Sequence, residues 1–274
     1  MDWLSLFNSA LTQRIANHPF ASNRLKKALL YAAESPGKRL RPRFVHESGL
    51  RFALSEFVIL RVAVAIECVH LFSLIHDDLP SLDNDDFRRG QPTVHRKFDE
   101  ATALLAGDEL LNFAYQIFAE ILPRVSAEAF GRALAFFSKC IGGEGMIGGQ
   151  MLEVEILQTQ STPDLPLLLK IQDLKTGALF RASILIPALL AGESLTSDAT
   201  LELKAFAEAF GFAFQIADDL DDEIQDQAQA KKNILSTIGR SAAIDLALSQ
   251  LYSNPRTPDF TASSLLIELI QSKR

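Results

Sequence analysis

The sequence predicts an all-α protein, with residues 1–274 forming one domain of about ten helices. Apolar residues recur at the spacing of a helix over most of the chain. No sustained alternation of apolar and polar residues, the pattern of a half-buried strand, lies between turn residues. With 274 residues, 48% of them hydrophobic, the chain is long enough to bury a substantial core.

The individual helices follow from this periodicity and from the residues that interrupt it. The clearest helical patterns cover residues 56–76, 101–122 and 200–222. Proline and glycine are expected to divide the chain between such stretches, because proline cannot continue a helix and glycine weakens one. In chain order, these breakers are Ser35-Pro36-Gly37, Leu79-Pro80, Gly90-Gln91-Pro92, Pro123, Gly142, Gly143, Gly145, Thr162-Pro163, Pro187, Gly192, Gly239 and Asn254-Pro255.

Composition excludes several classes of protein. The net charge of −7 argues against a nucleic-acid partner, which would require a basic surface. Two cysteines, Cys68 and Cys140, are too few for a disulfide framework and favour a reducing, cytoplasmic location. The first 20 residues lack the basic start and apolar run of a signal peptide, and we expect no membrane span.

The acidic residues are concentrated in two places. Residues 77–86 hold five acidic side chains and residues 218–226 hold six, with no lysine or arginine in either stretch. The rest of the chain has 23 acidic and 27 basic residues, a net charge of +4. Neighbouring carboxylates repel one another, so holding them together costs free energy unless a cation lies among them.

The placement of these carboxylates on helices indicates the kind of cation. Asp218 and Asp222 are four residues apart, so both lie on one face of a continuing helix. Pro80 disfavours helical geometry at Leu79, so Asp77 is expected near the end of a helix, where the helix dipole adds to the repulsion. Carboxylates without histidine or cysteine are hard oxygen ligands, which magnesium prefers.

Either cluster alone could be an ordinary solvated helix end, since single acidic runs usually are. That interpretation fits poorly when both runs end long apolar helices and both are followed by basic residues. The first run precedes Arg88 and Arg89, and the second precedes Lys231 and Lys232. The pair of runs therefore predicts a magnesium site.

The motifs Asp77-Asp78-x4-Asp83 with Arg88-Arg89, and Asp218-Asp219-x-x-Asp222, resemble the two aspartate-rich motifs of trans-isoprenyl diphosphate synthases. The resemblance continues in family order over nearly the whole chain. Its further motifs are GKRLRP (37–42), ECVHLFSLIHDD (67–78), GGQ (148–150), KTGALF (175–180), FQIADD (214–219) and KKN (231–233). The four residues between the aspartates of the first motif resemble the bacterial farnesyl diphosphate synthase type.

The resemblance implies a helical bundle of the isoprenoid synthase type around a central cavity. It also implies magnesium, with manganese as an alternative, held by Asp77, Asp78, Asp83, Asp218, Asp219 and Asp222. The metal would hold an allylic diphosphate, dimethylallyl or geranyl diphosphate, which ionises and is attacked by the alkene of isopentenyl diphosphate. The family further implies a homodimer.

By the same resemblance, the allylic diphosphate site comprises Arg88, Lys175, Thr176, Gln215 and Lys232. The isopentenyl diphosphate site comprises Lys38, Arg41, His70 and Arg89. Arginine and lysine suit diphosphate because one can bind two oxygens and the other supplies a point charge. Judged singly, Lys38 and Arg41 could be solvated charges and His70 a core histidine.

Product length is expected to depend on the depth of the apolar cavity below the first motif. In this family, an aromatic residue five positions before the first aspartate resembles the floor of farnesyl-producing members, and Phe72 holds that position here. Ser73 lies one turn below Asp77, at about 6 Å along the helix axis. The resemblance therefore implies farnesyl diphosphate as the product, with geranyl and geranylgeranyl diphosphate as alternatives, and with Phe72 and Ser73 controlling chain length. Judged alone, Phe72 could be a core phenylalanine.

Three positions differ from the family pattern: Pro36 replaces a glycine, Glu153 replaces an aspartate, and no threonine-tyrosine-proline sequence follows Lys232. Two other functions share the metal chemistry or the fold. A class I terpene cyclase would need no second diphosphate site, and a non-catalytic regulatory subunit would be expected to have lost aspartates. The basic residues of the isopentenyl site and the six aspartates favour condensation over both.

Overall fold

The computed structural model describes residues 2–159, 163–221 and 233–273, and the described chain is almost entirely helical. This confirms the predicted all-α class. The chain divides into two compact units, residues 1–127 and residues 128–274, and each is described by itself. That residues 1–274 form a single domain stays a prediction, because it depends on how the two units are joined.

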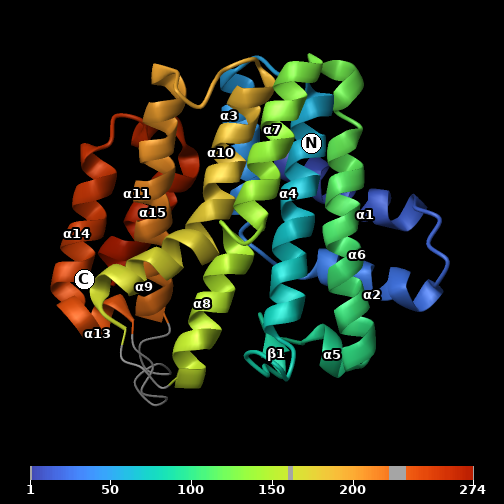
Figure 1. Cartoon of the computed structure of the whole chain (residues 1–274), viewed down its shortest axis with the longest axis horizontal. Coiled ribbons are helices and arrows are strands. Elements are labelled where there is room, and N and C mark those ends of the chain that lie inside the picture. Colours follow the sequence, from blue (N-terminus) through green and yellow to red (C-terminus); the bar gives the residue numbers. More distant parts are fainter. Residues whose placement is uncertain (1, 160–162, 222–232, 274) are drawn as a thin grey trace. The chain divides into compact units, whose positions relative to one another are not determined.

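The first unit consists of six α-helices, a short hairpin and a 3₁₀ turn among its described residues (Figure 1). In chain order these are α1 (Trp3–Asn17), α2 (Asn23–Glu34), α3 (Leu40–Arg51), α4 (Glu56–Asp77), β1 (Phe87–Arg88), β2 (Gln91–Pro92), α5 (Val94–Lys97), α6 (Glu100–Ala119) and η1 (Leu122–Arg124). Among the described residues of this unit, the hairpin of two-residue strands is the one departure from helix and turn. The sequence did not predict it, because strands this short leave no alternating pattern.

Helix α4 is the core of the first unit, and it packs against α1, α3 and α6. The Ser55 hydroxyl caps its first turn by accepting the backbone N–H of Val58. Among the described helices, α4 alone is long and apolar enough to cross a membrane, but 78% of its most apolar window is buried inside the protein. A helix that is apolar on all sides fits such a core position.

The last turn of α4 is fixed against α6 by His76. Nε2 of His76 lies 3.0 Å from the carbonyl oxygen of Leu104. A side chain at Gly107 would overlap the His76 ring, so only glycine allows this approach. The His76 ring also meets the ring of Phe72 edge to face, with centroids 5.0 Å apart. The two helices run side by side in Figure 1.

The second unit is helical throughout its described residues. Its elements are α7 (Ala127–Ile141), α8 (Met146–Thr159), α9 (Leu165–Gln172), the π-helix η2 (Asp173–Gly177), α10 (Ala178–Leu190), α11 (Asp198–Asp221), α13 (Ile234–Ile238), α14 (Arg240–Ser253), η3 (Thr257–Asp259) and α15 (Thr261–Ser272). Helix α11 packs against α10, α14, α15 and η2, which makes it the central helix of this unit.

Aromatic packing holds α11 in place. The rings of Phe206 on α11 and Phe260 beside α15 stack at 4.5 Å, and Phe180 of α10 meets Phe210 edge to face at 5.1 Å. Such pairs add to the stabilisation from burial. This core supports the C-terminal turn of α11, which carries the second aspartate motif.

One expected breaker is wrong. Pro187 lies inside α10 and does not separate two helices. Proline removes one backbone donor, so the carbonyl of Ser183 loses its usual helical partner. The helix nevertheless continues to Leu190, because its side chains are buried on every side around this position. Tertiary packing therefore overrides the local preference of proline.

Candidate active site

The first aspartate motif lies at the end of α4, where the sequence predicts the helix to stop. Asp77 is the last helical residue, and the N–H of Asp78 still donates to the carbonyl of Leu74 at 3.2 Å. Beyond Pro80 the chain turns back, and the N–H of Asp83 donates to the carbonyl of Asp77 at 2.9 Å. The predicted helix end is confirmed, and the turn brings the backbone of Asp83 against that of Asp77.

Asp78 is buried against Arg88. Its carboxylate is only 3% exposed, and Oδ1 accepts hydrogen bonds from Nε of Arg88 at 2.7 Å and from Nη2 at 2.6 Å. Arg88 Nη2 also lies 3.7 Å from Oδ2 of Asp85. Part of the repulsion between the clustered carboxylates is therefore offset by an arginine from the same segment.

The hairpin places Arg88 and Arg89 on different partners. Arg89 and Gly90 form its two-residue turn, with φ angles of 53° and 77°. Both angles being positive matches the type I′ turn that suits the twist of short hairpins. The turn therefore directs one arginine back to Asp78, whereas Nη1 of Arg89 donates to the carbonyl of Pro36 at 2.8 Å.

The surroundings of Asp78 destabilise the ionised form of its carboxyl. Burial raises its pKa, and Arg88 opposes that shift without cancelling it. The nearby carboxylates of Asp85 and Asp83 raise the pKa further. An acidic group of this kind gains from an additional cation, which is the property expected of a metal ligand.

His70 of α4 lies among arginines that come from other segments of the first unit. Its pKa is held well below the usual value of 6.5, first by burial and then by the charges of Arg41, Arg89, Arg39 and Arg88. The structure thus brings together three of the four residues assigned to the isopentenyl diphosphate site. The fourth, Lys38, is exposed to solvent in the loop before α3.

A buried ion pair that sequence reasoning missed anchors this loop. Nη1 of Arg39 lies 2.5 Å from Oε1 of Glu67, and the two side chains are 6% and 2% exposed. Nη2 of Arg39 donates to the carbonyls of Ala33 and Ser35, at 2.7 and 3.1 Å. Arg39 also adopts a left-handed backbone conformation, with φ of 50°, between Lys38 and the first turn of α3.

One signal in the sequence could have revealed this pair. Glu67 interrupts a long apolar helical stretch, and a buried carboxylate requires a cationic or hydrogen-bonding partner. The motif GKRLRP directly precedes the motif that contains Glu67, so its arginines are the candidate partners. The sequence alone does not say which arginine turns inward.

In the second unit, Lys175 and Thr176 lie on the π-helix η2. Nζ of Lys175 lies 2.5 Å from Oε2 of Glu153 on α8, the position where the family commonly has aspartate. A side chain at Gly149 would overlap the backbone nitrogen of Lys175. Gly149 therefore permits close packing of α8 on the π-helix, and π-helical turns are frequent at functional sites.

A chain of hydrogen bonds links Thr176 to the second aspartate motif. Oγ1 of Thr176 donates to Oε1 of Gln215 at 3.3 Å, and Nε2 of Gln215 donates to Oδ1 of Asp219 at 2.9 Å. The other oxygen of Asp219 accepts the N–H of Ile234 at 3.3 Å. Asp219 is 5% exposed and Asp218 is half-buried beside it.

Two of the predicted site residues, Asp222 and Lys232, lie outside the described residues. Within the described ranges, no three histidine, cysteine, aspartate or glutamate side chains form a group of the kind that holds a metal ion. The metal ligand set therefore stays a prediction.

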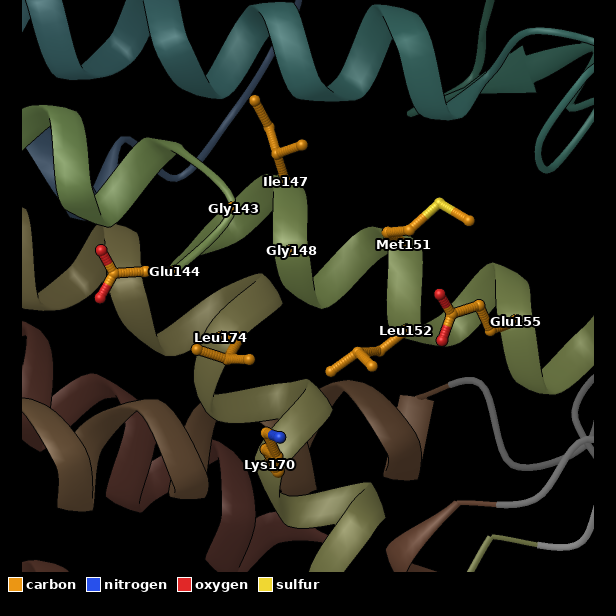
Figure 2. Close-up of a pocket in the computed structure, with 9 residues that line it drawn as sticks. All are labelled: Gly143, Glu144, Ile147, Gly148, Met151, Leu152, Glu155, Lys170 and Leu174. Atoms are coloured by element: carbon orange, nitrogen blue, oxygen red, sulfur yellow. The ribbon is translucent and has the colours of Figure 1, made fainter.

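A cavity of about 650 Å³ lies on the surface of α8, α9 and the π-helix. Figure 2 shows Leu152 of α8 and Leu174 of the π-helix extending toward each other within it. Its lining comprises Gly143, Glu144, Ile147, Gly148, Met151, Leu152, Glu155, Lys170 and Leu174. No site residue predicted from the sequence lines this cavity, although Leu174 precedes Lys175 directly.

The comparison with known families accounts for these motifs. Residues 22–243 match the family model of polyprenyl synthetase. The chain belongs to the polyprenyl synthetase family. The predicted resemblance is therefore confirmed at the level of the family.

Individual relatives support the same conclusion. The chain is 42% identical over 187 residues to farnesyl diphosphate synthase of Escherichia coli, covering 68% of this chain and 62% of that protein. It is 43% identical over 185 residues to farnesyl diphosphate synthase of Geobacillus stearothermophilus, covering 67% and 61%. These matches thus span about three-fifths of the curated relatives' length.

A solved structure resembles the chain over a longer range. The FPP/GFPP synthase of Zymomonas mobilis superposes with a TM-score of 0.85 at 34% identity, covering 98% of this chain and 95% of that one. The helical fold is therefore shared along nearly the whole chain.

We expect that breaking the Arg39–Glu67 pair strongly destabilises the fold. Replacing Arg39 by Met leaves a buried carboxylate without its cation, which should lower the free energy of unfolding by about 3 kcal/mol or more. Urea denaturation followed by circular dichroism measures the change. Arg24→Met, which breaks the exposed Arg24–Asp99 pair, is the matched control and should cost less than about 1 kcal/mol.

The double variant Arg39→Met/Glu67→Met should be less destabilised than the sum of the two single variants, because it leaves no buried charge unpaired. Simple additivity of the two changes would show that the residues do not act as a pair.

Stability should also depend on the protonation of His70. Because its pKa in the folded protein lies below 6.5, the unfolded chain binds the proton first as the pH falls, and folding stability is lost below pH 6.5. The free energy of unfolding should therefore fall more for the wild type than for His70→Gln between about pH 7.5 and about pH 5.5. Equal losses in both proteins would place the acid sensitivity elsewhere.

Proposed function

We propose that this protein is a prenyltransferase that condenses isopentenyl diphosphate with an allylic diphosphate, dimethylallyl or geranyl diphosphate. We propose farnesyl diphosphate as its main product. Membership of the polyprenyl synthetase family and the similarity to farnesyl diphosphate synthases support this assignment.

One observation carries the proposal. In the first unit, an acidic helix end with the buried Asp78–Arg88 pair adjoins further cations around His70, among them Arg41 and Arg89. A reaction between two diphosphates needs both features, because metal ligands must hold one diphosphate and protein cations must bind the other. A terpene cyclase, which ionises a single diphosphate, has no use for the second group.

The residues present fit magnesium. The donors of the first motif are carboxylate oxygens, and burial, with a smaller effect of Asp85 and Asp83, keeps the pKa of Asp78 raised even beside Arg88, so its ionised form would gain from a further cation. We propose that Asp77, Asp78 and Asp83, with Asp218, Asp219 and Asp222 of the second motif, hold it. The pairing of the two motifs is supported by their sequence pattern and by the family. When bound, magnesium neutralises diphosphate charge and makes the diphosphate a better leaving group.

The chain's own residues would bind and orient the allylic diphosphate. We assign Lys175 and Arg88, with Lys232, as donors to its oxygens, where they stabilise the charge that develops as the carbon–oxygen bond breaks. Gln215 holds the Thr176 hydroxyl and Asp219 in fixed positions through its two hydrogen bonds. The electron pair of the broken carbon–oxygen bond leaves with the diphosphate, and an allylic cation remains.

The second substrate would be held by Lys38, Arg41, His70 and Arg89. Because the pKa of His70 is low, its imidazole is neutral at physiological pH and can donate one hydrogen bond without adding charge. The alkene electrons of isopentenyl diphosphate form the new carbon–carbon bond to the cation. Loss of a proton restores a double bond, and the products are the longer diphosphate, inorganic diphosphate and that proton.

A homodimer and a cytoplasmic location remain parts of the proposal. The dimer is supported by family membership, and α6 carries two exposed apolar side chains, Leu104 and Leu105. The location is supported by the two cysteines, Cys68 and Cys140, both of which are free and buried.

Turnover by the purified protein tests the function. With magnesium, isopentenyl diphosphate and geranyl diphosphate, we expect a longer prenyl diphosphate by mass spectrometry, and EDTA should abolish it. Asp78→Asn and Asp219→Asn should each lower kcat/KM by about 100-fold or more. Asp198→Asn, an exposed change at the opposite end of α11, is the matched control and should retain activity.

Omitting isopentenyl diphosphate separates the candidate functions. Hydrocarbon products formed from the allylic substrate alone would indicate a terpene cyclase. Absence of any turnover by a folded, magnesium-loaded protein would overturn the assignment as a prenyltransferase and favour a non-catalytic subunit.

Phe72 should limit product length. It is 7% exposed on α4, one helical turn from the first motif, and Ser73 beside it bonds back to the carbonyl of His70 at 2.8 Å. Phe72→Ala should shift the products toward longer chains, as measured by chromatography of the dephosphorylated alcohols. Phe118→Ala is the control, because it removes the same volume from a buried position about 16 Å along α6 from Gly107. It should leave the product pattern unchanged. An unaltered pattern in a folded Phe72→Ala protein would remove Phe72 from this role.

A further inference from the structure

The π-helical turn that carries Lys175 and Thr176 is an unusual structure that needs stabilising contacts from the surrounding protein. Residues Asp173–Gly177 form a π-helix between two α-helices, α9 and α10. A π-turn contains an extra residue relative to an α-helical turn and is rarely stable on its own. If it relaxed to α-helix, the side chains on one side of the turn would rotate about the axis relative to those on the other by about 100°, the angle of one residue.

An arginine from the following helix spans this turn. Nη1 of Arg181 donates to Oδ1 of Asp173, and Nη2 donates to the backbone carbonyl of the same residue at 3.2 Å. Arg181 lies eight residues after Asp173, so its guanidinium bridges the whole π-helix from the end to the beginning. The Arg181 side chain is 13% exposed and that of Asp173 is 48% exposed, so the bridge is buried on the arginine side and open to solvent on the aspartate side.

Both sides of the π-helix are in close contact with other helices of the unit. Gly149 of α8 abuts the backbone nitrogen of Lys175, and a Cβ at Gly211 of α11 would lie 3.2 Å from Cα of Gly177. These contacts leave little room for the turn to shift as a whole. The bridge from Arg181 therefore selects the conformation of the turn, because the neighbouring helices already fix its position.

We propose that Asp173 and Arg181 are a positioning pair that keeps the π-helix open and so directs the Lys175 ammonium and the Thr176 hydroxyl to the allylic diphosphate. The pair touches no substrate itself. It acts through Lys175, which bonds Glu153, and through Thr176, which bonds Gln215. This inference rests on the proposed function, since it names what fixes two residues of the proposed allylic site.

Steady-state kinetics of Arg181→Met test the proposal, because methionine keeps much of the apolar volume and removes both hydrogen bonds. We expect KM for geranyl diphosphate to rise about tenfold, while KM for isopentenyl diphosphate changes by less than about twofold. Asp173→Asn should shift KM in the same direction by a smaller factor, since its carbonyl still accepts one bond. Arg181→Lys should recover part of the loss.

Arg132→Met is the matched control. Arg132 also bonds one carboxylate, that of Glu128, and one backbone carbonyl, that of Gly192, in the same unit. Its replacement should leave both KM values at the wild-type level. A general loss of stability would affect the two arginine variants alike, whereas a positioning role separates them.

Binding of inorganic diphosphate in the presence of magnesium, measured by calorimetry, gives a second readout. The affinity should fall about tenfold in Arg181→Met and stay unchanged in Arg132→Met. Unchanged affinity and unchanged KM in a folded Arg181→Met protein would overturn the positioning pair. A wild type that binds diphosphate but shows no condensation would instead contradict the proposed function, and the calorimetric comparison would still decide the role of Arg181.

Discussion

The requirement that buried charges be paired organises the first unit. Helix α4 is apolar along most of its length, yet Glu67 and Asp78 are both almost fully buried on it or at its end. Each carboxylate is matched by an arginine from a loop, Arg39 in one case and Arg88 in the other. Breaking a pair of this kind costs far more than forming it gains, so the pairs constrain conformation more than they add stability.

The spacing of these two carboxylates has a geometric result. Eleven residues separate Glu67 from Asp78, which is about three helical turns, so both lie on nearly the same face of the helix. The loop before α3 and the hairpin after α4 are therefore attached along one side of a rigid rod. His70 lies between the two attachment points on the chain. Asp78 thus positions Arg88, which is proposed to bind the allylic diphosphate, and Glu67 anchors through Arg39 the loop that carries Lys38.

The second unit reaches a similar end with hydrogen bonds in place of buried ion pairs. Gln215 connects Thr176 on the π-helix to Asp219 on α11, and Asp219 in turn accepts the N–H of Ile234. Gln215 and Asp219 both belong to α11, and their partners belong to two other elements, so the acidic end of α11 has a defined relation to the π-helix and to α13. Lys175 is held separately through Glu153 of α8. The extra length of glutamate, compared with the family's aspartate, still permits this contact.

The sequence predicted the features that depend on local pattern. Helical periodicity identified the core helices, and Pro80 located the end of α4. It missed those that depend on tertiary contacts: the inward turn of Arg39, the π-helix at Lys175 and the helical continuation through Pro187. Nothing in a run such as KTGALF distinguishes a π-turn from an α-turn, because the difference comes from Gly149, Gly211 and Arg181 around it.

The contact between His76 and Gly107 separates two properties that are adjacent in the sequence. Since His76 contacts the backbone of α6, the helical turn that carries Asp77 has an attachment to α6 in addition to the ring contact between His76 and Phe72. On the proposed function, evolution or an engineer building a library can therefore vary the size of the residue at position 72 while the end of α4 that carries Asp77 keeps its attachment to α6. Such modularity would let one scaffold be retuned from one hydrocarbon to another without rebuilding its reactive centre.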